Sequence, residues 1–162
     1  MARQRRADDR SAYDKALGLL ARREHSAREL KAKLAARGSN AGEAKAAVER
    51  LQDQQYQSDD RFAGSLARQR SGQGYGPRRI AAELKSHGVA DAEIRAAIDG
   101  LDVDWPALAT AQLRRRHGNA PVDTHEERAR RAAFLLRRGF DAATVRAATR
   151  ADLSDSGDNS DV

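Results

Sequence analysis

The residues of this chain that could carry out acid–base or metal chemistry are few and scattered. There is no cysteine, which excludes thiol nucleophiles and thiolate metal ligands. His125-Glu126 begins like a zinc-protease motif, but the position of the second histidine is occupied by Ala129. The four histidines are spread along the chain: His25, His87, His117 and His125. We therefore expect no enzyme activity, no cofactor and no bound metal.

Two adjacent carboxylates, Asp59 and Asp60, leave two interpretations open. The pair suits a divalent cation, and it also suits the first turn of a helix. There, Ser58 or an aspartate accepts hydrogen bonds from free backbone N–H groups, and negative charge is favourable. Phe62 and Leu66 follow at helical spacing, which favours the capping interpretation.

Three alternating glycines, Gly72, Gly74 and Gly76, precede Pro77 at an expected helix start. The pattern suggests a phosphate-binding loop. However, no strand precedes the glycines and no Gly-Lys-Ser/Thr follows them, as nucleotide loops require. We therefore predict a flexible turn between two helices.

Tyr75 lies inside this turn, between Arg70 and the pair Arg78-Arg79. An aromatic ring among guanidinium groups suits nucleic acid, because the ring stacks on a base while the arginines hold phosphate. The ring equally suits a structural role, in which it covers the hydrophobic seam beneath the turn. Both interpretations remain open.

Other arginines cluster where the first helix of each expected set ends. A curved array would bring these ends to one side and form a basic stripe. The alternative is a solvated charged face with partners on the same helix, such as Glu24 and Glu126. The candidate contact residues for a partner or DNA are Arg22, Arg23, Arg68, Arg70, Tyr75, Arg78, Arg79, Arg114, Arg115 and Arg116.

The segments that must position these side chains are helical. Long stretches are rich in Ala, Leu, Arg and Glu, and only three prolines interrupt them. No stretch alternates like a strand, and no apolar run is long enough for a membrane span. The net charge is +6, and the four aspartates after Arg150 make the preceding body more basic still. We expect a cytoplasmic protein with an acidic or nucleic-acid partner.

An internal repeat of fifty residues organises these helices. Leu30, Leu34 and Gly38 recur as Ile80, Leu84 and Gly88, and then at a spacing of fifty-one as Leu135 and Gly139. Arg131 replaces the first apolar position in the third copy, so the repeat drifts there. A period of this length indicates stacked helical units, each of which buries its apolar face against the neighbouring units. We predict an all-α fold, an elongated curved array of three tandem three-helix repeats.

The predicted boundaries divide the chain into five segments. A basic disordered arm (1–10) precedes three repeats at 11–57, 58–102 and 103–150, and an acidic disordered tail (151–162) follows them.

Several motifs in order carry a resemblance to a known family. Tyr56-Gln-Ser-Asp-Asp-Arg-Phe62-Ala63 stands at the first repeat boundary, and Gly76-Pro-Arg-Arg-Ile80-Ala-Ala-Glu-Leu84 follows it. With Ala16-Leu-Gly-Leu-Leu-Ala-Arg22 upstream, this order resembles the RecX family of bacterial recombination regulators.

The resemblance implies three tandem three-helix repeats and binding to the RecA nucleoprotein filament. It implies inhibition of the filament's ATPase, strand-exchange and coprotease activities, and so modulation of recombination, DNA repair and the SOS response. It also implies binding to single- and double-stranded DNA without catalysis. We expect a monomer.

Two other functions fit the residues alone. One is a stand-alone DNA-binding protein without a protein partner, and the other is a general helical scaffold. The basic clusters favour the DNA-binding protein, whereas helical repeats fit either function.

Overall fold

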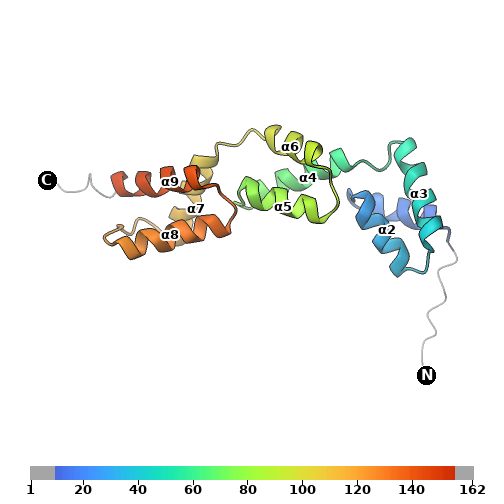
Figure 1. Cartoon of the computed structure of the whole chain (residues 1–162), viewed down its shortest axis with the longest axis horizontal. Helices are drawn as coiled ribbons and strands as arrows, with labels where there is room; N and C mark the ends of the chain where they lie inside the picture. Colours follow the sequence, from blue (N-terminus) through green and yellow to red (C-terminus); the bar gives the residue numbers. More distant parts are fainter. Residues whose placement is uncertain (1–9, 156–162) are drawn as a thin grey trace, which may run out of the picture.

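The computed structural model describes residues 10–155, with side chains up to residue 150, and this range contains nine α-helices and no strand. Figure 1 shows them in chain order along an elongated molecule. Their bounds are α1 (Ala12–Leu20), α2 (Ala27–Ala36), α3 (Ala41–Asp53), α4 (Asp59–Gly72), α5 (Pro77–Ser86), α6 (Asp91–Asp99), α7 (Trp105–His117), α8 (His125–Arg137) and α9 (Ala142–Asp155).

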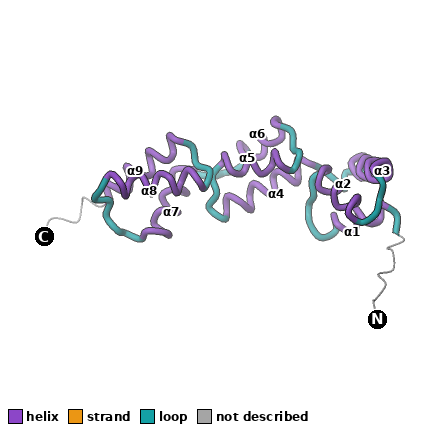
Figure 2. Tube along the Cα trace, turned by 60° about the horizontal axis from the view of Figure 1, so that its bottom comes forward, coloured by secondary structure: helices purple, strands orange, loops and turns teal. Residues whose placement is uncertain are grey.

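The nine helices pack as three trios: α1–α3 (repeat 1), α4–α6 (repeat 2) and α7–α9 (repeat 3). The trios follow one another along the long axis, and Figure 2 shows the row gently bowed. The all-α array of three tandem three-helix repeats is therefore confirmed.

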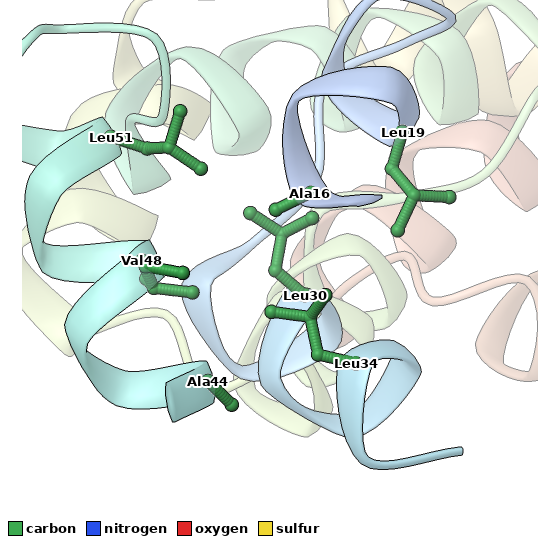
Figure 3. Close-up of a cluster of buried hydrophobic side chains, with 8 residues drawn as sticks. Ala16, Leu19, Leu30, Leu34, Ala44, Val48 and Leu51 are labelled. Atoms are coloured by element: carbon green, nitrogen blue, oxygen red, sulfur yellow. The ribbon is translucent and has the colours of Figure 1, made fainter. Parts of the chain in front are cut away.

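Each trio has a hydrophobic core of its own. In repeat 1, apolar side chains of α1, α2 and α3 point toward one another (Figure 3), and Leu30, Leu34, Val48 and Leu51 are fully buried. These residues recur at three- and four-residue spacing, which places them on one face of each helix.

The cores of repeats 2 and 3 use the same positions. Ile80 and Leu84 are central in repeat 2, and Leu135 and Phe140 in repeat 3. Trp105, at the start of α7, packs partly against both cores and is the apolar side chain they share.

The middle helix of each trio ends in the same way. A glycine with positive φ follows it: Gly38 at 89°, Gly88 at 77° and Gly139 at 93°. The next residue donates its backbone N–H back to the leucine carbonyl five positions earlier, as in Ser39 to Leu34 at 3.0 Å. Every fifty residues, therefore, both the buried apolar face of the middle helix and the glycine that ends this helix recur.

Side chains cap most helix starts as the sequence predicts. Asn40 and Glu43 form a reciprocal capping box at α3. Ser26 caps α2 by accepting from the Glu29 N–H at 3.1 Å, without the reciprocal bond of a capping box. The Glu29 carboxylate instead binds Arg23 and lies 3.1 Å from His25 Nδ1.

The third repeat departs from the repeat pattern at Arg131, as predicted, because a buried charged side chain takes the place of an apolar one. Arg131 is 1% exposed at the place of Leu30 and Ile80. Its guanidinium donates to Glu127 at 3.1 Å and to the Ala120 carbonyl at 2.8 Å. The hydrogen bond from Arg131 lowers the pKa of Glu127 below its usual value. The pair ties the loop before α8 to that helix.

Helix α1 begins at Ala12, within the predicted first repeat, and Ser11 caps it by accepting from the Asp14 N–H. One correction is needed at the other end of the helical array. The acidic tail was predicted to leave the helix at 151, whereas α9 continues to Asp155 because no glycine or proline stops it. Residues 1–9 of the arm and 156–162 of the tail lie outside the described range. Within 10–155, no helix is long and apolar enough to cross a membrane.

Candidate functional site

Repeats 2 and 3 are joined through backbone groups. The turn before α5 meets the turn between α8 and α9, where the Gly76 N–H donates to the Arg138 carbonyl at 2.8 Å. The Arg78 N–H donates to the Gly139 carbonyl at 2.9 Å. Two paired backbone hydrogen bonds fix the relative position of the two turns, whatever side chains surround them.

The glycines of this turn are explained by close approach. A Cβ added at Gly76 would lie 2.5 Å from the Gly139 carbonyl oxygen, and one at Gly74 would lie 2.5 Å from Gln112 Oε1. At Gly76 the close atoms are backbone, so a side chain there would have to move the neighbouring repeat. At Gly74 the close atoms belong to the flexible Gln112 side chain, and the φ of 82° is what favours glycine. The predicted turn between two helices is confirmed, and these contacts pack it against repeat 3, while its flexibility stays a prediction.

A row of alternating guanidinium groups and rings crosses the same junction. The guanidinium carbons of Arg79 and Arg138 each lie 4.3 Å from the Tyr75 ring centroid. Arg138 also lies 5.9 Å from the Phe134 ring, and Arg116 lies 4.7 Å from it. We call the series Arg79, Tyr75, Arg138, Phe134 and Arg116 the arginine–aromatic ladder. Each contact is a cation–π interaction. Arg138 on Tyr75 joins repeats 3 and 2, and Arg116 on Phe134 joins α7 to α8, whereas the other two contacts are between residues four positions apart.

Arg138 holds the ladder in place. Its guanidinium donates to the Gln73 carbonyl at 2.6 Å and to the Gly74 carbonyl at 3.1 Å. Neither Arg138 nor Phe134 stands out in the sequence. Arg138 lies more than sixty positions from the two carbonyls that it binds, so no local spacing pattern shows these contacts.

Two predicted roles near Tyr75 change in the light of these contacts. The Tyr75 ring faces its own arginines, so a base reaches it only by displacing Arg79 or Arg138. Arg70 is bound to Glu83 through two hydrogen bonds of 2.8 and 2.7 Å. The hydrogen bond raises the pKa of Arg70 and lowers that of Glu83. Arg70 thus acts as a link between α4 and α5.

A surface hollow of about 510 Å³ opens beside the ladder, and we call it the junction hollow. Its lining joins three arginines, two aromatic rings and two carboxamides: Arg115, Arg116, Arg138, Tyr75, Phe134, Gln73 and Gln112. Three other surface hollows each include at least one carboxylate, drawn from Glu24, Asp59, Asp60, Glu83, Glu93 and Asp102.

Repeats 1 and 2 are joined mainly through side chains. Asp59 Oδ1 accepts from the Ala27 N–H at 2.8 Å and from Gln57 Nε2 at 2.9 Å. Gln57 Nε2 also lies 3.1 Å from the His25 carbonyl, and Arg61 pairs with Glu24 at 3.0 Å. Ser58 caps α4, as predicted, but Asp59 does more than occupy its first turn. It binds the start of α2 in the preceding repeat.

The remaining candidate arginines are divided between these places. Arg23 is paired with Glu29, and Arg68 lies in a hollow that also contains Glu24 and Asp60. The other candidates are exposed: Arg22 in the turn after α1, Arg78 and Arg79 on α5, and Arg114, Arg115 and Arg116 in the last turn of α7. A continuous basic stripe along the molecule stays a prediction.

Comparison with known proteins identifies this arrangement of helices. Three family models match in order: the first RecX three-helix domain at residues 12–51, the second at 58–98 and the third at 102–149. The chain belongs to the RecX family. Regulatory protein RecX of Xanthomonas axonopodis pv. citri (strain 306) is 46% identical over 153 residues, which are 94% of either chain. Regulatory protein RecX of Stenotrophomonas maltophilia (strain K279a) is 45% identical over 153 residues, with the same coverage.

Solved RecX structures share the fold. The crystal structure of RecX from Lactobacillus salivarius matches with a TM-score of 0.70 and 21% identity, over 88% of this chain and 94% of that one. A further crystal structure, of regulatory protein RecX, matches with a TM-score of 0.71 and 21% identity, over 83% of this chain and 68% of that one. RecX is thus a family of regulatory proteins built from three helical domains.

Proposed function

We propose that this chain binds the RecA nucleoprotein filament and inhibits its ATPase, strand-exchange and coprotease activities. Through this it would modulate recombination and DNA repair as a monomer. The observation that carries the proposal is the elongated row of three similar trios, each with its own core. A helical filament presents the same surface again and again along its groove. A row of related units matches such a surface better than a single pocket does.

Modest contacts made by successive repeats combine through effective concentration. Once one repeat is bound, the others search only a small volume, so total affinity exceeds that of any single contact. This requires repeats that hold a defined spacing. The backbone pairing at the junction of repeats 2 and 3 and the Asp59 contacts at the junction of repeats 1 and 2 supply that spacing.

The charge of the chain fits a filament that carries DNA. The net charge of +6 favours approach to acidic surfaces and to phosphate, with a strength that falls as salt increases. A second candidate function, DNA binding without a protein partner, is favoured by the junction hollow because no carboxylate lines it. A general helical scaffold has no comparable observation in its support.

The test is the ATPase activity of RecA on single-stranded DNA with increasing amounts of this protein. We expect substoichiometric protein to reduce the rate of ATP hydrolysis. A parallel titration with excess single-stranded DNA separates filament binding from simple sequestration of DNA, since only sequestration is relieved by more DNA. An unchanged rate at equimolar protein contradicts the proposed function.

A further inference from the structure

The junction hollow differs in charge from the three other hollows described above. Arg115 and Arg116 lie exposed in the last turn of α7, and Arg138 lies across from them. Among the described residues, none that lines this hollow carries a carboxylate, whereas Glu83 lines the neighbouring hollow beside Arg70. Guanidinium forks bind phosphate in two-point geometry, so the hollow is suited to a phosphodiester.

The volume and the remaining lining point to more than a phosphate. A hollow of about 510 Å³ is far larger than a carboxylate or a phosphate group and lies in the range of small-molecule sites. The carboxamides of Gln73 and Gln112 add donors and acceptors that match base edges. A single acidic side chain of a protein partner would leave most of this space unfilled.

The last guanidinium of the ladder provides a stacking surface. Arg116 is exposed, and the Phe134 ring supports its guanidinium at 4.7 Å. The His117 ring packs against the same ring in an edge-to-face arrangement, with the two ring centroids 6.2 Å apart. Unpaired bases stack on guanidinium planes as well as on rings. Tyr75 cannot offer such a face because Arg79 and Arg138 already occupy it.

We propose that the junction hollow binds an unpaired nucleotide of a single-stranded nucleic acid, with Arg115 on a phosphodiester and a base stacked on Arg116. A duplex is a poorer ligand because its bases are paired and stacked inside, where they cannot enter a hollow. The choice of single-stranded DNA as the ligand rests on the proposed function, since a recombinase filament carries this DNA. The proposed site itself predicts that the chain binds single-stranded DNA in the absence of any recombinase.

The test measures binding of a fluorescent oligothymidylate and of a matched duplex by anisotropy, at several salt concentrations and without RecA. Arg115→Ala should lower the slope of log affinity against log salt by about 0.7, the contribution of one phosphate contact in a single strand. Arg116→Lys keeps the charge but removes the plane, so it should weaken oligothymidylate binding at least about fivefold with little change in slope. Neither variant should weaken duplex binding as much.

The matched control is Arg95→Ala, because Arg95 is exposed on α6 and lies outside all four hollows. It removes the same charge and should leave the oligothymidylate affinity close to that of the parent chain. Circular dichroism of each variant checks that the helices are intact. If Arg115→Ala and Arg116→Lys bind oligothymidylate as Arg95→Ala does, the inference is overturned. Equal losses on duplex and single strand also overturn it.

RecA ATPase measurements on the same variants keep this inference separate from the proposed function. If the variants bind oligothymidylate normally but no longer inhibit RecA, the hollow contacts the protein, so the inference fails and the proposed function stands. If the parent chain never inhibits RecA but the variants lose oligothymidylate binding, the inference stands alone.

Discussion

Among single residues, His25 is buried where repeats 1 and 2 meet. Its side chain lies 3.1 Å from Glu29, and its carbonyl accepts from Gln57. Burial lowers the pKa of His25 below 6.5, against the opposing pull of the Glu29 carboxylate, while Arg23 and Lys33 add to the lowering. The folded chain therefore favours the neutral imidazole.

This shift predicts a loss of stability in mild acid. The unfolded chain binds a proton near pH 6.5, while the folded chain resists it, so the free energy of unfolding falls as pH drops through this range. His25→Gln removes the titration and should flatten the fall between about pH 6.5 and 5.5. Chemical unfolding at each pH measures this, with His125→Gln at an exposed histidine as control. A fall of the same size in His25→Gln would contradict the assignment.

Residue types were predicted better than residue partners. The capping role of Ser58 followed from local spacing because a cap binds a backbone N–H within three residues. The ladder did not, because Tyr75 and Arg138 meet only when two turns from different repeats come together. Arg70 was predicted as a phosphate ligand because nothing local shows that Glu83 would fold back onto it.

At the scale of elements, the turn before α5 is the most constrained connection. Gly76→Ala should destabilise the chain by about 1–3 kcal/mol, because the added methyl group must push repeat 3 away. Gly72→Ala is a matched control four residues earlier, with no atom within 4 Å of the added Cβ. It should leave stability unchanged or raise it by up to about 1 kcal/mol. Thermal unfolding compares them, and equal effects would disprove the close approach.

The helices were predictable, and the packing of the turn before α5 was not. The fifty-residue repeat of leucines and glycines predicted the middle helices and where they end, because both depend on local backbone geometry. The packing of the turn around Gly76 depends on a neighbour from the next repeat, which glycine spacing alone does not show. The predicted end of α9 at residue 150 was too early because the acidic composition after Arg150 suggested disorder, although no glycine or proline ends the helix before Asp155.

For the whole molecule, the junction of repeats 1 and 2 governs how straight the row stays. Asp59→Ala leaves the Ala27 N–H without its carboxylate and should cost about 1–3 kcal/mol. Asp60→Ala removes the neighbouring, exposed carboxylate from the same helix turn and should cost less than about 1 kcal/mol. Chemical unfolding measures both.

Small-angle X-ray scattering compares the overall shapes of the same two variants. We expect Asp59→Ala to broaden the distribution of end-to-end distances, while Asp60→Ala keeps the parent profile. Identical profiles for the two variants would show that Asp59 does not hold the first repeat. A near-spherical particle for the parent chain would contradict the array itself.

The two junctions also differ in how readily substitution can reshape them. Between repeats 2 and 3 the paired contact is made by main-chain groups, so most side-chain exchanges leave it in place, except at Gly76 and Gly139, where the backbones approach too closely for a Cβ. Between repeats 1 and 2 it is made by Gln57 and Asp59, which single codon changes can replace without disturbing any core. The first repeat is therefore the adjustable end of the molecule, where fit to a partner can be retuned while the other two repeats keep their shared geometry.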